Sequence, residues 1–451
     1  MVEVQCNLGI QSVASTMDQS LLDLPDDVLL AVLAYLSPVE LLACRVLCRR
    51  LRDLCLHREL WKTAHVRSVV GDRGVARAAL RLAPCLRRVF FGDLGPISSL
   101  VASTECAVTE LSVLVRLDTE VAPATAIVQK FATLGGLKSL DLLLGMSLEI
   151  DTAYDLLEAV YRLTCLRELK ISVCQNSELG DPRRDGARVR SSLVKLSYSR
   201  FQDPFLELLL TTHGATLEEV ALLTGDSLPV NLLAAMPRLR SLTCHMSNEL
   251  VYSHGLSRLE TLHLNASDRF FTPNALEFFR RAPNLRTVSF SVPRQDPASP
   301  LQALAASPSA RVLEVLNLRW GAPHLMDLTW LAGFIPRFPS LRSLSLDTSL
   351  LRVDLDGLLQ SVTPTSAPSL TALRMTSSGC PHAWLHRSAV QELLTRNARL
   401  HLHVGGDIPR QCSCEWCSRG CHAGLRGTLS RRAMASHRRT AGCPSGCCMW
   451  P

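Results

Sequence analysis

One apolar phrase, apolar-x-x-apolar-x-apolar, recurs twelve times along this chain of 451 residues. Successive copies begin 20 to 29 residues apart, and the alternation within each copy is typical of a β-strand with one buried face. Helical patterns lie between the copies, as at residues 153–161 and 274–280. A unit of one strand and one helix leaves an apolar face that only the next unit can cover, so the units must stack into a continuous array. The copies begin at Leu86, Val108, Leu137, Leu166, Leu193, Leu217, Leu239, Leu259, Leu285, Leu313, Leu341 and Leu370.

The intervals between copies fall in the range of leucine-rich repeats, whose parallel strands form the concave face of a solenoid and whose helices form the convex face. We therefore predict an α/β fold in which about twelve such repeats occupy residues 67–405. The shortest interval, before Leu259, leaves too little chain for a full helix. Leu400, Leu402 and Val404 predict a last strand, after which the pattern stops.

Short helices are predicted before the repeats. The segment Leu24-Pro25-Asp26-Asp27 is typical of a helix start, because acidic side chains are favourable in a first turn. Ser37-Pro38-Val39-Glu40 has the pattern of a capping box and predicts a second helix start. Three helices should end near residues 36, 47 and 56, with a helical turn at 59–62. Residues 29–36 are all apolar, so the first helix needs cover on several sides, from a neighbouring domain or a partner protein.

Residues 24–61 resemble an F-box over 38 residues without a gap. The resemblance rests on Leu24-Pro25-Asp26-Asp27, the Ser37-Pro38 turn, Cys48-Arg49-Arg50 and Leu60-Trp61. It implies a three-helix F-box at residues 21–66 that docks on the adaptor of an SCF ubiquitin ligase and, through it, on cullin and RING subunits. The repeats would then hold a protein substrate for ubiquitination. The adaptor-binding residues that the resemblance implies are Leu24, Pro25, Leu29, Leu33, Leu36, Pro38, Leu41, Leu42, Cys48, Leu60 and Trp61.

Two other functions stay open at this point. The F-box family usually has Trp where this chain has Leu51, which leaves room for a non-catalytic scaffold or inhibitor that binds a partner without ubiquitination. A zinc-dependent ligase acting through a cysteine-rich tail is the third possibility. The sequence contains no phosphate-binding loop, dinucleotide-binding motif or zinc-protease motif. We therefore predict a chain that is not an enzyme and needs no cofactor.

The concave face is the predicted substrate surface. The third, fifth and seventh positions of each phrase face away from the core, and they carry charged groups near both ends of the array and hydroxyl and imidazole groups in its middle. Such groups suit hydrogen bonding with a protein segment. The strongest candidates are His245, His263 and Asn265 in the middle repeats. The full predicted set is Glu168, Lys170, Lys195, Glu219, His245, His263, Asn265, Arg319 and Arg374.

The two ends of the chain lack the repeat pattern. Residues 1–20 are predicted to be a flexible leader, and residues 406–451 a disordered tail rich in Cys and Arg. Only the Cys414-x-x-Cys417 pair in that tail has the spacing of a metal site, so no metal is expected. The weak zinc candidates are Cys412, Cys414, Cys417 and Cys421.

Charge and hydropathy restrict the partners and the compartment. The net charge is +7, but six arginines and no acidic residue follow Glu415, so the rest of the chain is close to neutral and no nucleic-acid partner is expected. No apolar run is long enough to span a bilayer, and the N-terminus lacks the pattern of a signal peptide. We therefore expect no membrane association and a location in the cytoplasm, the nucleus or both.

Overall fold

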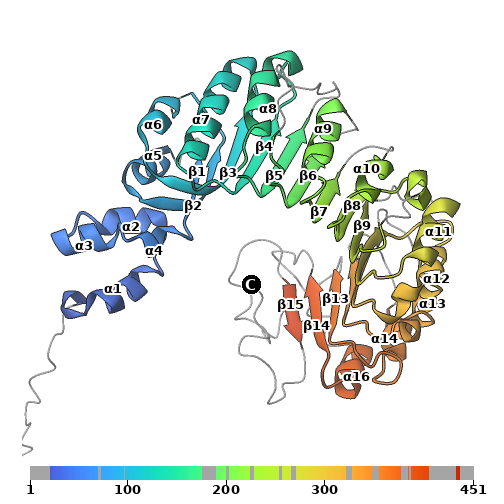
Figure 1. The fold of residues 1–451 in the computed structure, drawn as a ribbon. Helices are drawn as coiled ribbons and strands as arrows, with labels where there is room; N and C mark the ends of the chain where they lie inside the picture. The colour runs from blue at the N-terminus through green and yellow to red at the C-terminus, as the bar shows by residue number, and fades with distance from the viewer. Residues whose placement is uncertain are drawn as a thin grey trace, which may run out of the picture. The chain divides into compact units, whose positions relative to one another are not determined.

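A computed structural model describes residues 21–69, 73–95, 97–174, 189–199, 203–223, 228–252, 256–265, 271–320, 328–347, 355–376, 384, 387–405 and 433–436 (Figure 1). The chain divides into two compact units. Unit 1 contains Met1–Val115 and Ala122–Lys138, and unit 2 contains Arg116–Val121 and Ser139–Pro451. The cysteines proposed as zinc candidates lie outside the described residues. No helix in the described part of the chain is long and apolar enough to cross a membrane.

Unit 1 begins with a cluster of short helices and continues into three parallel strands. The helices of the first part are η1 (Leu21–Asp23), α1 (Asp26–Leu33), α2 (Pro38–Cys44), α3 (Arg49–Leu54) and α4 (Arg58–Trp61). The strands and helices that follow are β1 (His65–Ser68), α5 (Arg73–Leu82), β2 (Cys85–Phe91), α6 (Ser98–Ser103), β3 (Ala107–Val115) and α7 (Val121–Thr133).

The capping box at the start of α2 is confirmed. The backbone N–H of Ser37 donates to Oε2 of Glu40 at 2.7 Å, and the backbone N–H of Glu40 donates to Oγ of Ser37 at 3.4 Å. The pKa of Glu40 is lowered by the hydrogen bonds that the backbone N–H and the hydroxyl of Ser37 donate to its Oε2, because they favour the charged carboxylate. With Pro38 in the first turn, they fix where α2 begins.

The three predicted helices are present but shorter than the sequence predicts, and the predicted helical turn at 59–62 is the four-residue helix α4. The first three end at Leu33, Cys44 and Leu54. Beyond α1 the backbone N–H groups of Tyr35 and Leu36 bond to carbonyls three residues back, which is a turn and not a continued α-helix. Apolar runs do not show where such a turn begins, because turn and helix residues can both be apolar.

The sheet of unit 1 contains one strand that the sequence analysis missed. β1 pairs in parallel with β2 from His65↔Arg88 to Ser68↔Phe91, and β2 pairs in parallel with β3. The first strand therefore begins at His65, two residues before the predicted start of the repeat array at residue 67. Its inward positions are Val66 and Ser68, so its sequence does not contain the full apolar phrase. α7 covers the sheet, and the rings of Phe91 and Phe131 stack with centroids 6.1 Å apart.

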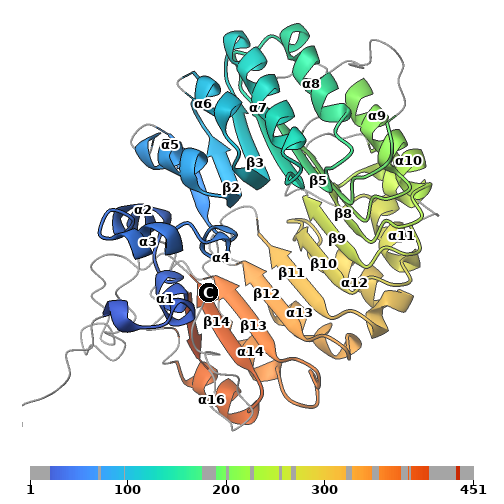
Figure 2. The ribbon, with the colours of Figure 1, turned by 60° about the vertical axis from the view of Figure 1, so that its left-hand side comes forward.

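Unit 2 is a parallel array in which each strand pairs with the next one along the chain, as far as β14. Figures 1 and 2 show its strands side by side on the inner face and its helices on the outer face. This confirms the predicted α/β architecture of N-terminal helices followed by a repeat solenoid. The strands are β4 (Ser139–Leu144), β5 (Glu168–Val173), β6 (Lys195–Ser199), β7 (Glu219–Leu222), β8 (Ser241–His245), β9 (Thr261–Asn265), β10 (Thr287–Ser291), β11 (Val315–Arg319), β12 (Ser343–Asp347), β13 (Ala372–Thr376) and β14 (His401–Gly405).

The outer face of unit 2 varies from repeat to repeat. Among the described residues between β8 and β9, the helix is a 3-10 helix, η4 (Asn248–Tyr252), in agreement with the short interval, which predicts no full helix. The α-helices of this face are α8 (Tyr154–Tyr161), α9 (Pro204–His213), α10 (Val230–Ala234), α11 (Pro273–Arg281), α12 (Ser299–Ala305), α13 (Thr329–Ala332), α14 (Asp356–Ser361) and α16 (Ser388–Arg396).

A row of apolar side chains runs through the core of unit 2 from strand to strand. The register pairs the fourth phrase position of each copy with that of the next, and every member of the row is at most 3% exposed. Truncating such a residue to Ala costs about 2–5 kcal/mol. The row consists of Leu140, Leu169, Leu196, Val220, Leu242, Leu262, Val288, Leu316, Leu344, Leu373 and Leu402.

Side-chain hydrogen bonds link successive repeats at the turns before four of the strands. Asn284 Nδ2 donates to the carbonyl of Ser257 at 2.8 Å, one repeat earlier. Ser340 Oγ donates to the carbonyl of Arg311 at 2.6 Å, again one repeat back. Thr216 and Ser369 make the same link to Leu193 and Pro339. Each of these four residues immediately precedes the first leucine of a phrase, a position where the sequence analysis did not look for structure.

One strand lies within the segment that the sequence predicts to be a disordered tail. Within 406–451, which the sequence predicts to be disordered, Ala433–Ser436 forms β15 and pairs antiparallel with β14. Without β15, the outer edge of β14 would present a row of unpaired backbone groups. The tail lacks the leucine pattern, so the sequence analysis could not identify a strand whose role is to pair with that edge.

His213 in α9 couples the stability of unit 2 to pH. Its side chain is buried, and its Nδ1 accepts a hydrogen bond from the backbone N–H of Ser192 at 3.1 Å, which requires a neutral ring. Burial lowers the pKa of His213 from 6.5 to about 4. The unfolded chain therefore binds more protons than the folded chain between these two values. The resulting stabilisation is complete above pH 6.5 and is lost as the pH falls toward 4.

We expect acidification from pH 6.5 to about 4 to reduce the free energy of unfolding by up to about 3 kcal/mol through this group. His213→Asn retains an acceptor oxygen but does not titrate, so its denaturation midpoint should depend less on pH in this window. His65→Asn, at an exposed position of β1, is the matched control. Chemical denaturation across this pH range measures the difference, and identical profiles for H213N and the parent chain would contradict the assignment.

Candidate functional site

Exposed apolar side chains concentrate in the N-terminal helices of unit 1. Of the eleven large hydrophobic residues that are exposed in the described chain, eight lie between residues 21 and 47. Apolar surface gathered in this way marks a contact with another molecule. The eight are Leu21, Leu22, Val28, Val32, Tyr35, Val39, Val46 and Leu47.

Helix α1 has two apolar faces. Leu29 and Leu33 are buried against the rest of the unit, whereas Val28 and Val32 are 40% and 41% exposed. Tyr35 follows at the next turn and is 91% exposed. Residues spaced by three or four lie on one side of a helix, so Val28 and Val32 form an outward stripe that Tyr35 extends. The predicted need for cover on several sides is therefore met on one side only by this chain.

The residues implied for adaptor contact divide by burial. Pro25 is exposed. The half-buried group consists of Leu24, Leu36, Pro38, Leu42 and Cys48. The buried group consists of Leu29, Leu33, Leu41, Leu60 and Trp61. Buried side chains support the surface from beneath; Trp61, for example, donates its indole N–H to the carbonyl of Cys55 at 2.7 Å. The sequence did not predict the eight exposed residues as contacts. A signal was available, because a helix that buries Leu29 and Leu33 must turn Val28 and Val32 outward.

Arg50 in α3 holds the start of α1. Its Nε and Nη2 donate to Oδ1 of Asp26 at 2.9 and 2.6 Å, and Nη2 also donates to the carbonyl of Leu24 at 2.7 Å. Nη1 donates to the carbonyl of Leu22. The guanidinium thus ties α3 to the Leu22–Asp26 segment, next to the exposed apolar side chains. Leu51, where the F-box family usually has Trp, is buried beside it.

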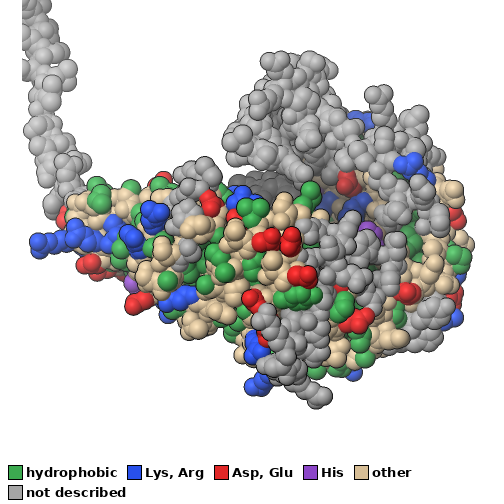
Figure 3. Space-filling model, turned by 90° about the horizontal axis from the view of Figure 1, so that it is seen from above, with side chains coloured by type: hydrophobic (Ala, Val, Ile, Leu, Met, Phe, Trp, Pro, Cys, Tyr) green, Lys and Arg blue, Asp and Glu red, His purple; other side chains and the backbone are tan. Residues whose placement is uncertain are grey.

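Charged groups of both signs accompany the apolar surface. Figure 3 shows hydrophobic, basic and acidic side chains interspersed over the described face, with Lys and Arg side chains at the end where Figure 1 places α3.

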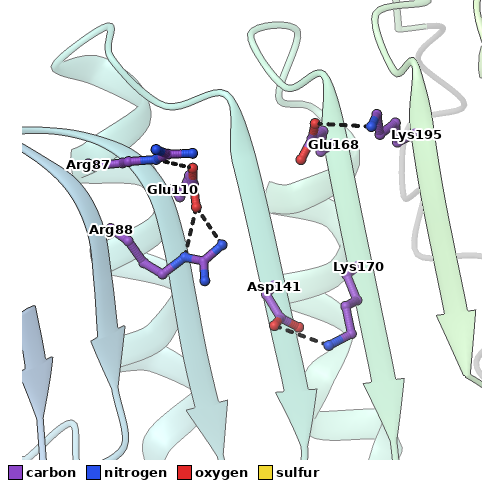
Figure 4. Close-up of polar contacts among 7 residues, drawn as sticks. All are labelled: Arg87, Arg88, Glu110, Asp141, Glu168, Lys170 and Lys195. Atoms are coloured by element: carbon purple, nitrogen blue, oxygen red, sulfur yellow. Dashed lines mark hydrogen bonds and ion pairs between the residues drawn. The ribbon is translucent and has the colours of Figure 1, made fainter. Parts of the chain in front are cut away.

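In unit 1, Glu110 accepts hydrogen bonds from Nε of Arg87 at 2.9 Å and from Nε of Arg88 at 2.7 Å (Figure 4). Burial raises the pKa of Glu110, but these two arginines outweigh that effect and lower it.

The first strands of unit 2 carry charges that neutralise one another. Lys170 Nζ lies 3.3 Å from Oδ2 of Asp141, and Lys195 Nζ lies 4.0 Å from Oε1 of Glu168 (Figure 4). Lys195 also lies 3.1 Å from Oε1 of Glu219, and the hydrogen bond to that carboxylate raises the pKa of the lysine. The register places these side chains on neighbouring strands, so four of the predicted substrate contacts, at 168, 170, 195 and 219, belong to this paired network.

The middle strands bring a second group of predicted contacts together. His245 lies opposite Asn265 in the register, and its Nε2 is 2.7 Å from the carbonyl oxygen of Leu223. Asn265 Oδ1 accepts a hydrogen bond from Nη2 of Arg319 at 3.0 Å. His263 is half-buried, and this burial together with the positive charge of Arg319 lowers its pKa. The remaining predicted contact, Arg374, lies on β13 and is not part of either group.

No metal site accompanies these surfaces in the part of the chain that the structure describes. No group of three or more His, Cys, Asp or Glu side chains is placed to hold an ion there. The groups that these surfaces present suit binding: burial of apolar area on unit 1, and hydrogen bonding and ion pairing on the strands of unit 2.

Comparison with known proteins identifies the first of these surfaces. Residues 21–67 match the family of F-box-like domains. No curated protein matches the chain. Among solved structures, the chain is similar to a chain of the crystal structure of the Rad7 and Elc1 complex in yeast, with 18% sequence identity and a TM-score of 0.40. That match covers 64% of this chain and 75% of the other. The exposed apolar side chains at residues 21–47 therefore belong to an F-box-like domain.

We expect Arg50→Lys to loosen the start of α1 without unfolding unit 1, because an ammonium group cannot reproduce the forked contacts to Asp26 and two carbonyls. The ion pair is largely exposed, so the free energy of unfolding should fall by no more than about 1 kcal/mol. Hydrogen exchange at the amides of α1 should accelerate. Arg49→Lys, at an exposed neighbour, is the matched control. Unchanged α1 protection in R50K would show that the guanidinium does not hold this segment.

Proposed function

We propose that this chain is the substrate-recognition subunit of an SCF-type ubiquitin ligase. The single observation that carries the proposal is the concentration of exposed apolar side chains on the F-box-like domain. Leaving such a surface in water is unfavourable, and about 25 cal/mol is gained for each Å² of it that a partner covers. The partner that an F-box-like domain implies is the SCF adaptor, through which the cullin and RING subunits would be recruited.

The proposed mechanism is proximity and not chemistry by this chain. The F-box-like domain would be anchored to the ligase, while the strands of unit 2 hold a protein substrate. Tethering raises the effective concentration of substrate lysines beside a ubiquitin-charged conjugating enzyme, which supplies the reactive thioester. The polar inner face of unit 2 supports this role, because its hydroxyl, amide and imidazole groups can bond to a protein segment.

We place this activity in the cytoplasm, the nucleus or both. Eight cysteines of the described chain are free thiols, four of them with intermediate or exposed side chains, and reduced thiols fit a reducing compartment. The scaffold alternative needs the same repeats but no adaptor. Adaptor binding therefore separates the two functions.

Val32→Glu combined with Tyr35→Glu should reduce co-purification of the adaptor and cullin at least about tenfold, because each residue would lose apolar contact worth about 1–2 kcal/mol. Both side chains are exposed, so the melting temperature should change little. The matched control replaces two exposed apolar residues outside the domain, Leu117→Glu with Met146→Glu. Full adaptor binding by the V32E/Y35E chain would contradict the proposed docking surface, and absence of adaptor from the parent chain would favour a scaffold.

A further inference from the structure

The inner face of unit 2 changes its electrostatic character along the array. On β4–β7, acidic and basic side chains alternate and pair with each other, as in the contacts of Lys170 with Asp141 and of Lys195 with Glu219. On β8–β14, Asp347 is the one acidic side chain among the described strand residues that point away from the core, on the inner face of the array. The rest of that face carries hydroxyl, amide, imidazole and guanidinium groups. The two parts therefore suit different ligands.

Two guanidinium groups on the later strands have no carboxylate partner within the described chain. Arg374 on β13 is exposed and makes no hydrogen bond or ion pair with the residues that the structure describes. Arg319 on β11 is also exposed, and its hydrogen bonds go to neutral oxygens, Asn265 Oδ1 at 3.0 Å and the carbonyl of Leu264 at 3.4 Å. Asp347 lies opposite Arg319 in the register, and these hydrogen bonds of the guanidinium go to the neutral oxygens of the β9 residues.

We propose that strands β11–β14 bind an acidic segment of the protein partner, an extended peptide whose carboxylate or phosphate groups pair with Arg319 and Arg374. The inference rests on the proposed function, since the peptide would belong to the substrate. Guanidinium groups form paired, charge-assisted hydrogen bonds with both kinds of anion. The excess of basic over acidic side chains on this face gives the charge complementarity that such a segment requires.

The register sets the spacing of the anions. Arg319 and Arg374 lie two strands and two residues apart, which places their Cα atoms about 12 Å from each other. An extended peptide advances about 3.3 Å per residue, so acidic residues about four positions apart would reach both guanidinium groups. Between them the face presents Asn317 and Ser345, which can bond to the peptide backbone. The site thus predicts an acidic segment with a defined spacing and not only a net negative charge.

The test measures binding of fluorescent peptides of about twelve residues to the full chain by anisotropy. One peptide alternates Ser with Glu, a second replaces Glu with phosphoserine, and a third replaces Glu with Lys. We expect the first or second peptide to bind the parent chain at least about tenfold more tightly than the third. The more tightly bound of the two anionic peptides identifies carboxylate or phosphate as the preferred group.

Arg319→Gln with Arg374→Gln should weaken binding of the preferred peptide at least about tenfold. The matched control, Arg238→Gln with Arg311→Gln, removes the same charge from exposed positions outside the inner face and should weaken it less than about twofold. Equal weakening by both variants, or equal binding of the anionic and lysine peptides, would overturn the proposal. Adaptor co-purification with R319Q/R374Q should match that of the parent chain, so a failure of the F-box proposal is detected separately.

Discussion

Coverage of each repeat by the next is the constraint on which unit 2 depends. A single strand and helix cannot bury both faces of their own apolar side chains, so the core exists only as a row that crosses repeats, from Leu140 to Leu402. The parallel backbone ladder fixes the register of that row, and side chains such as Asn284 and Ser340 bond to carbonyls one repeat back. Because side chains alternate along a strand, those that do not point into the core point to the inner face, and they are mostly polar.

The two surfaces bind by different physics. The F-box-like domain offers Val28, Val32 and Tyr35, whose contribution comes from apolar area removed from water and is nearly insensitive to salt. The inner strands offer charges and hydrogen-bonding groups, whose attraction is screened by ions when the groups are exposed. Salt would therefore affect binding at the two surfaces differently, and the proposed partner of one need not resemble the proposed partner of the other.

The sequence predicts most strands of this fold because the leucine phrase reports burial directly. It fails where burial does not determine the structure. β1 has only two inward positions, one of them Ser68, and β15 is defined by the edge with which it pairs. The candidate sites are limited in the same way, because burial cannot be read from an apolar sequence alone. The residues of α1 are apolar throughout its second half, yet Leu29 is buried and Val32 is exposed, and only the packing distinguishes them. Links such as Asn284 to Ser257 depend on a neighbouring repeat, which the local sequence does not display.

The thin 3-10 helix between β8 and β9 has a geometric consequence. Neighbouring strands are about 4.8 Å apart, whereas packed helices need about 8–10 Å, and this mismatch bends such an array. Where η4 replaces a full helix, the outer side needs less width and the bend per repeat decreases. We therefore expect the array to bend less between β8 and β9, where His245 lies opposite Asn265 in the register.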